Sequence, residues 1–115
     1  TGDAVLIGGL IVSSEGSAQA NVVLRGLGPS LGALGVSGAL QDPTVELHDG
    51  NGELVAFDDN WRDSQEGIIG STGLAPNDDR EAAIFAHLVA GAYTAVVRGL
   101  NDTTGIALVE AYNIP

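Results

Sequence analysis

The chain has 115 residues, a length that suits one domain (residues 1–115) with a single hydrophobic core. Fifteen Asp and Glu against four Arg and no Lys give a formal net charge of −11. Such a surface repels phosphate groups, which argues against nucleic acid as a partner and against anionic membrane surfaces. No apolar run reaches the roughly 18–20 residues of a membrane span, so no membrane insertion is expected.

The composition also indicates where the protein works. The chain has no Cys, and therefore no disulfide or thiolate chemistry, and it contains 17 Gly. High acidity without Lys or Cys is typical of secreted bacterial surface modules. Because the sequence begins Thr-Gly-Asp without Met, we interpret it as a mature extracellular segment whose signal peptide is already absent.

Residues 4–12 (AVLIGGLIV) are almost wholly apolar and predict a strand that is buried on both faces or that needs a partner surface. Gly8-Gly9 argues for a bulge or a close backbone approach, and against a helix. Two interpretations stay open: a central strand of the chain's own sandwich, or, with residues 1–13 as an exchanged segment, a strand donated to the next copy. Head-to-tail donation produces filaments. The expected assembly residues are Ala4, Val5, Leu6, Ile7, Leu10, Ile11 and Val12.

Residues 18–26 predict a second strand, and residues 27–40 an ordered loop with one helical turn whose apolar side chains tuck under the sheets. Within this loop, residues 28–32 match the G-x-S-x-G pattern of a hydrolase nucleophile. That motif needs a large α/β sheet and a partnered His and acid, and the chain is too short for such a fold. We therefore expect no enzymatic activity.

Residues 42–61 predict a β-hairpin. Two alternating runs, 44–48 and 53–57, flank Asp49-Gly50-Asn51-Gly52, in which Asp, Asn and Gly allow the backbone to reverse tightly. The second run leads into Asp58-Asp59-Asn60 and Trp61, the only Trp. The hairpin thus brings several oxygen-bearing side chains to one loop.

These oxygens suggest a calcium site, because Ca²⁺ takes six to eight oxygen ligands. The candidate ligands are Asp49, Asp58, Asp59 and Asn60, with Asp78, Asp79 or Glu81 folded nearby. The alternative is that the carboxylates are simply solvated turn residues.

Trp61 also has two interpretations. With Tyr93 or Tyr112 it would form a platform on which a carbohydrate ring stacks. Alternatively, its side chain packs under the hairpin loop.

The last part of the chain predicts further strands. Residues 80–88 fit a short helix as well as a strand, whereas 92–100 and 105–114 predict strands. The turn between these two contains Asn101-Asp102-Thr103, a glycosylation sequon that makes Asn101 a candidate modification site. About seven short strands spaced roughly 8–12 residues apart indicate an all-β, jelly-roll-like, two-sheet antiparallel β-sandwich.

From Asp42 onward the sequence resembles the bacterial pre-peptidase C-terminal (PPC-like) domains. The matching residues are Asp42, Val45, Leu47, Asp49, Gly52, Asp58 and Asp59 in the hairpin, then Gly91-Ala92-Tyr93, Val97, Gly105 and Leu108. The resemblance implies a β-sandwich that acts as a non-catalytic accessory module of exported proteins. It also implies that calcium binding or surface attachment is within the range of functions.

The sequence therefore predicts a non-catalytic extracellular structural module that assembles with copies of itself or with other surface proteins. The self-polymerising form of this hypothesis uses residues 4–12 as the donated strand. The alternative is a calcium-dependent module that binds carbohydrate or another surface ligand at Asp58, Asp59 and Trp61.

Overall fold

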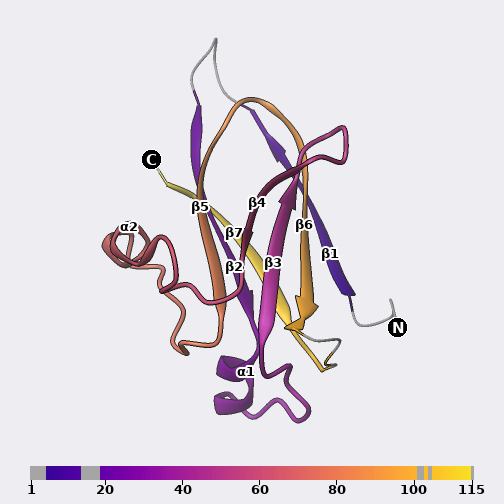
Figure 1. Cartoon of the computed structure of the whole chain (residues 1–115), viewed down its shortest axis with the longest axis vertical. Coiled ribbons are helices and arrows are strands. Elements are labelled where there is room, and N and C mark those ends of the chain that lie inside the picture. The colour runs from indigo at the N-terminus through magenta and orange to yellow at the C-terminus, as the bar shows by residue number, and fades with distance from the viewer. Residues whose placement is uncertain (1–4, 14–18, 101–102, 104, 115) are drawn as a thin grey trace.

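The computed structural model describes residues 5–13, 19–100, 103 and 105–114. Over these residues the chain forms an antiparallel β-sandwich of two layers (Figure 1). The predicted all-β two-sheet fold is therefore confirmed. The strands are β1 (Val5–Val12), β2 (Ala20–Leu27), β3 (Pro43–His48), β4 (Leu54–Asp58), β5 (Ala82–Leu88), β6 (Gly91–Gly99) and β7 (Leu108–Ile114).

Except for β3 and β4, strands that are consecutive in sequence lie in different sheets. One sheet has the order β1-β6-β3-β4 and the other has the order β5-β2-β7. We call these the four-stranded sheet and the three-stranded sheet. Strand β1 belongs to the chain's own sandwich, as the first of the two interpretations of residues 4–12 expects, but it lies at the edge of its sheet, so the predicted central position is wrong.

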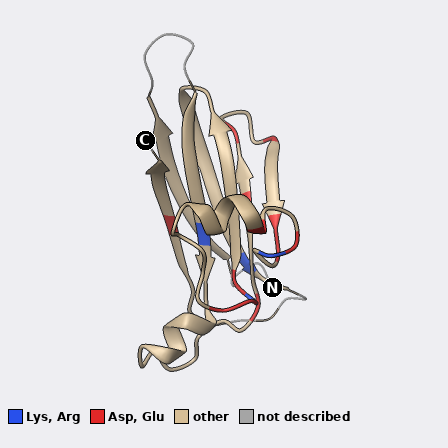
Figure 2. Ribbon diagram, turned by 90° about the vertical axis from the view of Figure 1, so that its left-hand side faces the viewer, with Lys and Arg blue, Asp and Glu red and all other residues tan. Residues whose placement is uncertain are grey.

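The core lies between the two sheets. Alternate residues of the inner strands face it, as the period of two in a strand requires. Val45, Leu47 and Val97 of the four-stranded sheet are fully buried there with Leu24 of the three-stranded sheet. Most charged residues lie in the connections and at strand ends (Figure 2).

Two short helices lie in the connections. Helix α1 (Pro29–Ala33) supplies the predicted helical turn, although it buries no residue of its own, and Leu40 is the residue of that loop that enters the core. Helix α2 (Glu66–Ser71) is anchored by the buried Ile69. No helix of the described residues is long and apolar enough to cross a membrane.

The hairpin predicted at 42–61 is present. Strands β3 and β4 pair antiparallel, and the Asp49 amide donates to the Glu53 carbonyl at 2.9 Å. The Asp49 side chain orders the turn by accepting from the backbone amides of Asn51 and Glu53. Gly52 has a φ of 82°, the left-handed conformation expected of glycine in such a turn.

A buried carboxylate joins segments at the other end of the sandwich. Glu81 directly precedes β5, and its Oε2 accepts from the backbone amides of Gly28 and Ser30 at 2.9 and 2.8 Å. The Ser30 hydroxyl donates to the other oxygen, Oε1. These bonds satisfy free amides at the start of α1 and hold it against β5.

The same corner requires a residue without a side chain at position 28. A Cβ on Gly28 would lie 2.0 Å from the Leu40 carbonyl oxygen, which is a severe overlap with backbone. The Leu40 amide in turn donates to the Ile106 carbonyl at 2.8 Å, so Leu40 is held from a second side and has little freedom to move.

We predict that Gly28→Ala lowers the free energy of unfolding by roughly 2–4 kcal/mol, because Leu40 must be displaced from the core. Gly32→Ala is the matched control: its new Cβ would lie 4.0 Å from Ala39, and Ala is the better helix former within α1. Urea unfolding of both variants measures the difference. Equal stability of the two would contradict the close approach at Gly28.

Candidate functional site

Strand β1 is held by the backbone of β6. All eight of its residues pair with β6, from Val5 opposite Arg98 to Val12 opposite Gly91. Its other edge pairs with no strand among the described residues. The first assembly residue predicted from the sequence, Ala4, lies outside the described residues.

The side chains of β1 contribute little to the core. Val12 is buried and Leu10 packs against the core, whereas Ile7 is 65% and Ile11 is 79% exposed. Gly8 and Gly9 place no side chain in the middle of the strand. An apolar strand at an edge with two exposed isoleucines has the character of a contact surface.

The seam between β1 and β7 is incompletely filled. These two strands are the edges of opposite sheets on the same side of the sandwich. A cavity of about 330 Å³ opens between Leu10–Ser13 of the first edge and Ala111–Asn113 of the second. A second cavity of about 180 Å³ lies along the same seam, between Gly8–Leu10 and Val109–Ala111.

Gly8 marks a point where the two edges approach tightly. A Cβ there would lie 3.2 Å from Cγ1 of Val109. Strand β1 thus comes close to β7 at one narrow point, while the rest of the seam leaves space. The sequence could not reveal this seam, because it is formed by segments from opposite ends of the chain.

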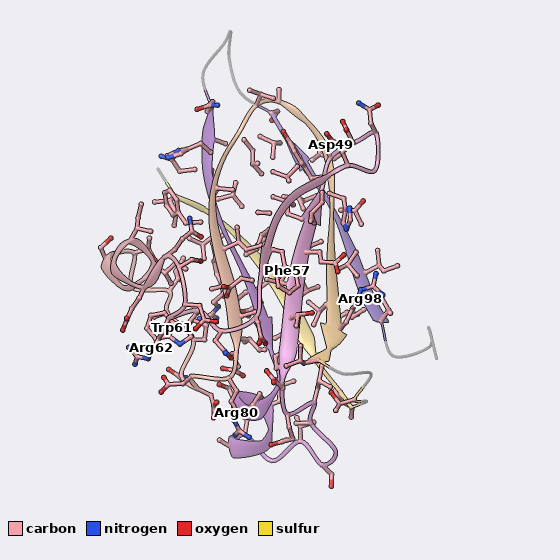
Figure 3. The ribbon with its side chains drawn as sticks, viewed as in Figure 1. Asp49, Phe57, Trp61, Arg62, Arg80 and Arg98 are labelled. Atoms are coloured by element: carbon pink, nitrogen blue, oxygen red, sulfur yellow. The ribbon has the colours of Figure 1, made fainter. Side chains whose placement is uncertain are left out.

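The candidate calcium ligands are not gathered in one place. Asp49 is at the hairpin turn, whereas Asp58 ends β4 and Asp59 and Asn60 follow it (Figure 3). The Asp49 oxygen Oδ1 is engaged by two backbone amides of its own turn. Within the described residues, no three His, Asp or Glu side chains are arranged to hold a metal ion. Calcium binding remains a prediction.

The two acids at the end of β4 have different environments. Asp58 is buried, and its Oδ2 accepts from the Ala83 amide at 3.0 Å, which ties β4 to β5. Burial is the largest cause that raises the pKa of Asp58 to about 6. Burial, followed by a hydrogen bond with the Asp42 carboxyl group, raises the pKa of Asp59 to about 6 as well.

Trp61 packs rather than presenting an open ring. Its side chain is 6% exposed and lies in a small cluster with Ile69 and Ala83. The Arg62 guanidinium covers the ring at 4.3 Å from its centroid (Figure 3). Tyr93 lies in the main core instead, so Trp61 and Tyr93 do not form the expected carbohydrate platform; the alternative platform with Tyr112, which is on β7, remains a prediction.

The serine of the G-x-S-x-G segment has a structural role. Ser30 is in α1 and its hydroxyl donates to Glu81. His48 is on β3 and His87 is on β5, in different sheets, and their side chains bond Glu46 and Asn21 respectively. The residues of a hydrolase triad are therefore not brought together. Asn101, the candidate glycosylation site, lies outside the described residues.

Comparison of the chain with protein-family models, with curated proteins and with solved structures gives no match. The resemblance to PPC-like domains therefore remains a prediction.

We predict that the protein becomes more stable as the pH falls from 7 toward 5. Asp58 and Asp59 have a pKa of about 6 in the folded chain and an ordinary value of 3.8. Between these values the folded state binds more protons than the unfolded state, so the free energy of unfolding decreases as the pH rises through that window. Thermal unfolding measured across this pH range tests the sign.

Asp59→Asn should flatten this dependence and raise the free energy of unfolding at pH 7 by about 1 kcal/mol, since one pKa unit corresponds to about 1.4 kcal/mol and solvent screens part of the effect. Glu53→Gln removes the same charge at an exposed position of the hairpin and is the control. A flattening of equal size in both variants would show that net charge, and not the Asp42–Asp59 contact, causes the pH dependence.

Proposed function

We propose that the chain is a non-catalytic structural module of an extracellular protein, and that it assembles with copies of itself by donation of β1. In this assembly, β1 of one copy takes the place of β1 beside β6 of the next. The observation that carries the proposal is the edge position of a strand that is apolar on both faces and incompletely packed.

The backbone geometry suits an exchange between identical copies. The bonds that hold β1 follow one uninterrupted register with β6, and the β1 of a second copy can form the same register. The β1–β6 pairing is then the same in the closed and the exchanged forms, so protein concentration decides which form predominates.

The groove that β1 would vacate is costly to leave empty. Tyr93, Ala95 and Val97 on β6 point into the core, and β3 occupies the far side of β6. Removing β1 would expose the near edge of β6 together with part of this apolar layer. A second β1 is therefore the natural occupant, and the open form is a short-lived intermediate.

The incomplete packing of β1 lowers the barrier to exchange. Val12 is its only buried side chain, and cavities lie along the seam near the contact between Gly8 and Val109. Strands that contribute much to a core unpair slowly, whereas β1 depends mainly on its backbone bonds.

We predict that a disulfide between β1 and β6 controls assembly. Gly9 and Thr94 are directly opposed, and a Cβ on Gly9 meets no atom within 4 Å. Opposed residues of antiparallel strands lie about 4.5–5.5 Å apart at Cα, within the range of a disulfide. Because the natural chain has no Cys, Gly9→Cys/Thr94→Cys introduces the only possible pair.

The variant should form no filaments when oxidised as a monomer and should form filaments, seen by electron microscopy, when reduced. If it is first assembled and then oxidised, a non-reducing gel should show a ladder of cross-linked copies. The reduced protein is the matched control. Filaments from the oxidised monomer, or no filaments from the wild-type chain at any concentration, would contradict strand donation.

A further inference from the structure

The four-stranded sheet has a second apolar surface on the side away from the core. Alternation along each strand places Ile7 of β1, Val96 of β6 and Phe57 of β4 on this outer face. The register aligns them in one row across the sheet, with Glu46 of β3 between Val96 and Phe57. Ile7 is 65% and Phe57 is 52% exposed.

Further exposed apolar residues extend this row. Ile11 lies on the same face of β1. On β4 the register with β3 shifts before Phe57, so that Leu54 is opposite His48; the residue at this irregularity, Val55, is 45% exposed. Phe57, labelled in Figure 3, lies on β4, the edge strand of this sheet opposite to β1. We call this surface, made by the exposed Ile7, Ile11, Val55 and Phe57 around Val96, which is itself only 6% exposed, the outer patch.

On the opposite face of the sandwich, the corresponding outward apolar residues are covered by another part of the chain. On the three-stranded sheet, the segment with Trp61 and α2 covers the outward residues Ala83 and Phe85, and Ile69 is completely buried there. No described segment covers the outer patch in the same way.

The charged residues on the face of the outer patch form ion pairs with one another. Among the residues that the strand register places on this face, the charged ones are Glu46 and Arg98, with His48 beside them. The Arg98 Nε donates to Oε2 of Glu46 at 3.3 Å, and the His48 Nε2 lies 2.8 Å from Oε1 of the same carboxylate. Burial acts to raise the Glu46 pKa, but the hydrogen bonds with His48 and Arg98 outweigh it, and the pKa is lowered.

The pairing of Glu46 with Arg98 leaves the outer patch without excess charge, and this limits which partners can dock on it. A basic partner finds no excess of acid on this face and would be drawn to the acidic connections instead. A second copy carries the same charge of −11, and contact through the acidic connections would place like charges together. The outer patch presents a compensated pair, so two copies can approach through it without uncompensated repulsion at the contact.

We infer that the outer patch is a self-association surface at which two copies of this chain pack face to face. The contact is isologous: Phe57 and Ile7 of each copy meet the same patch on the other, and the sheets stack as in a sandwich. This inference does not rest on strand donation, because no strand has to leave its sheet.

The test is sedimentation velocity of the whole chain over a concentration series from low micromolar to near-millimolar. The wild-type chain should form dimers that reverse quickly on dilution, and added salt should strengthen them by screening the net charge. Val55→Thr/Phe57→Thr should raise the dimer dissociation constant by at least about tenfold, because each substitution occurs twice in the contact.

Leu34→Thr/Val89→Thr is the matched control, since Leu34 and Val89 are exposed apolar residues away from the outer patch, and Val89 is 55% exposed. It should leave the dissociation constant unchanged. A circular-dichroism melt of each variant checks that the chain is folded.

Three outcomes would overturn the inference: a wild-type chain that stays monomeric throughout, which would assign the patch to a different partner; equal weakening by the control; or dimers that dissolve in salt. Strand donation is tested separately by the disulfide between positions 9 and 94. Val55→Thr/Phe57→Thr changes only β4, so it leaves the pairing of β1 with β6 intact.

Discussion

The buried carboxylate of Glu81 is the constraint on which one side of this sandwich depends. It bonds the amides of Gly28 and Ser30 where β2 passes into α1, and the Glu81 backbone carbonyl accepts from the Trp61 amide at 2.9 Å. Three segments that are distant in sequence therefore meet at one residue. A buried carboxylate without hydrogen-bond donors is costly, so these segments are held together cooperatively. Loss of any one donor to Glu81 destabilises the buried carboxylate and thereby weakens the packing of all of these segments.

The two sides of the sandwich consequently differ. On the β4–β5 side, Asp58 bonds the Ala83 amide and Trp61 packs over the same strand, so polar and apolar contacts close the edge together. On the β1–β7 side the sheets approach near Gly8 and leave cavities along the seam. Strand β6 is paired with β3 along its other edge, which gives β1 a defined partner even though few side chains of β1 enter the core.

Features that depend on local chemistry can be predicted from the sequence. The hairpin at residues 42–61 follows from the turn residues around Asp49, and the strands at 92–100 and 105–114 follow from their apolar patterns. Sheet order is not predictable in this way, because the edge position of β1 depends on pairing with β6 near the other end of the chain. Residues 80–88 are ambiguous by pattern alone, and pairing with β2 makes most of them a strand. The sequence suggests Glu81 only as a metal ligand, since nothing in its neighbourhood along the chain reveals that its partners are at positions 28 and 30.

The apolar character of β1 is informative because edge strands are normally protected. Proteins place Lys, Pro or inward charges on exposed edges to prevent association. Residues 5–12 contain none of these, and the chain has no Lys at all. The net charge of −11 opposes association at long range. The apolar attraction at the outer patch, which includes Ile7 and Ile11, acts only at contact. Salt and acid weaken the repulsion and leave the attraction intact. In the proposed face-to-face association, ionic strength and pH therefore determine how strongly two copies repel each other as they approach.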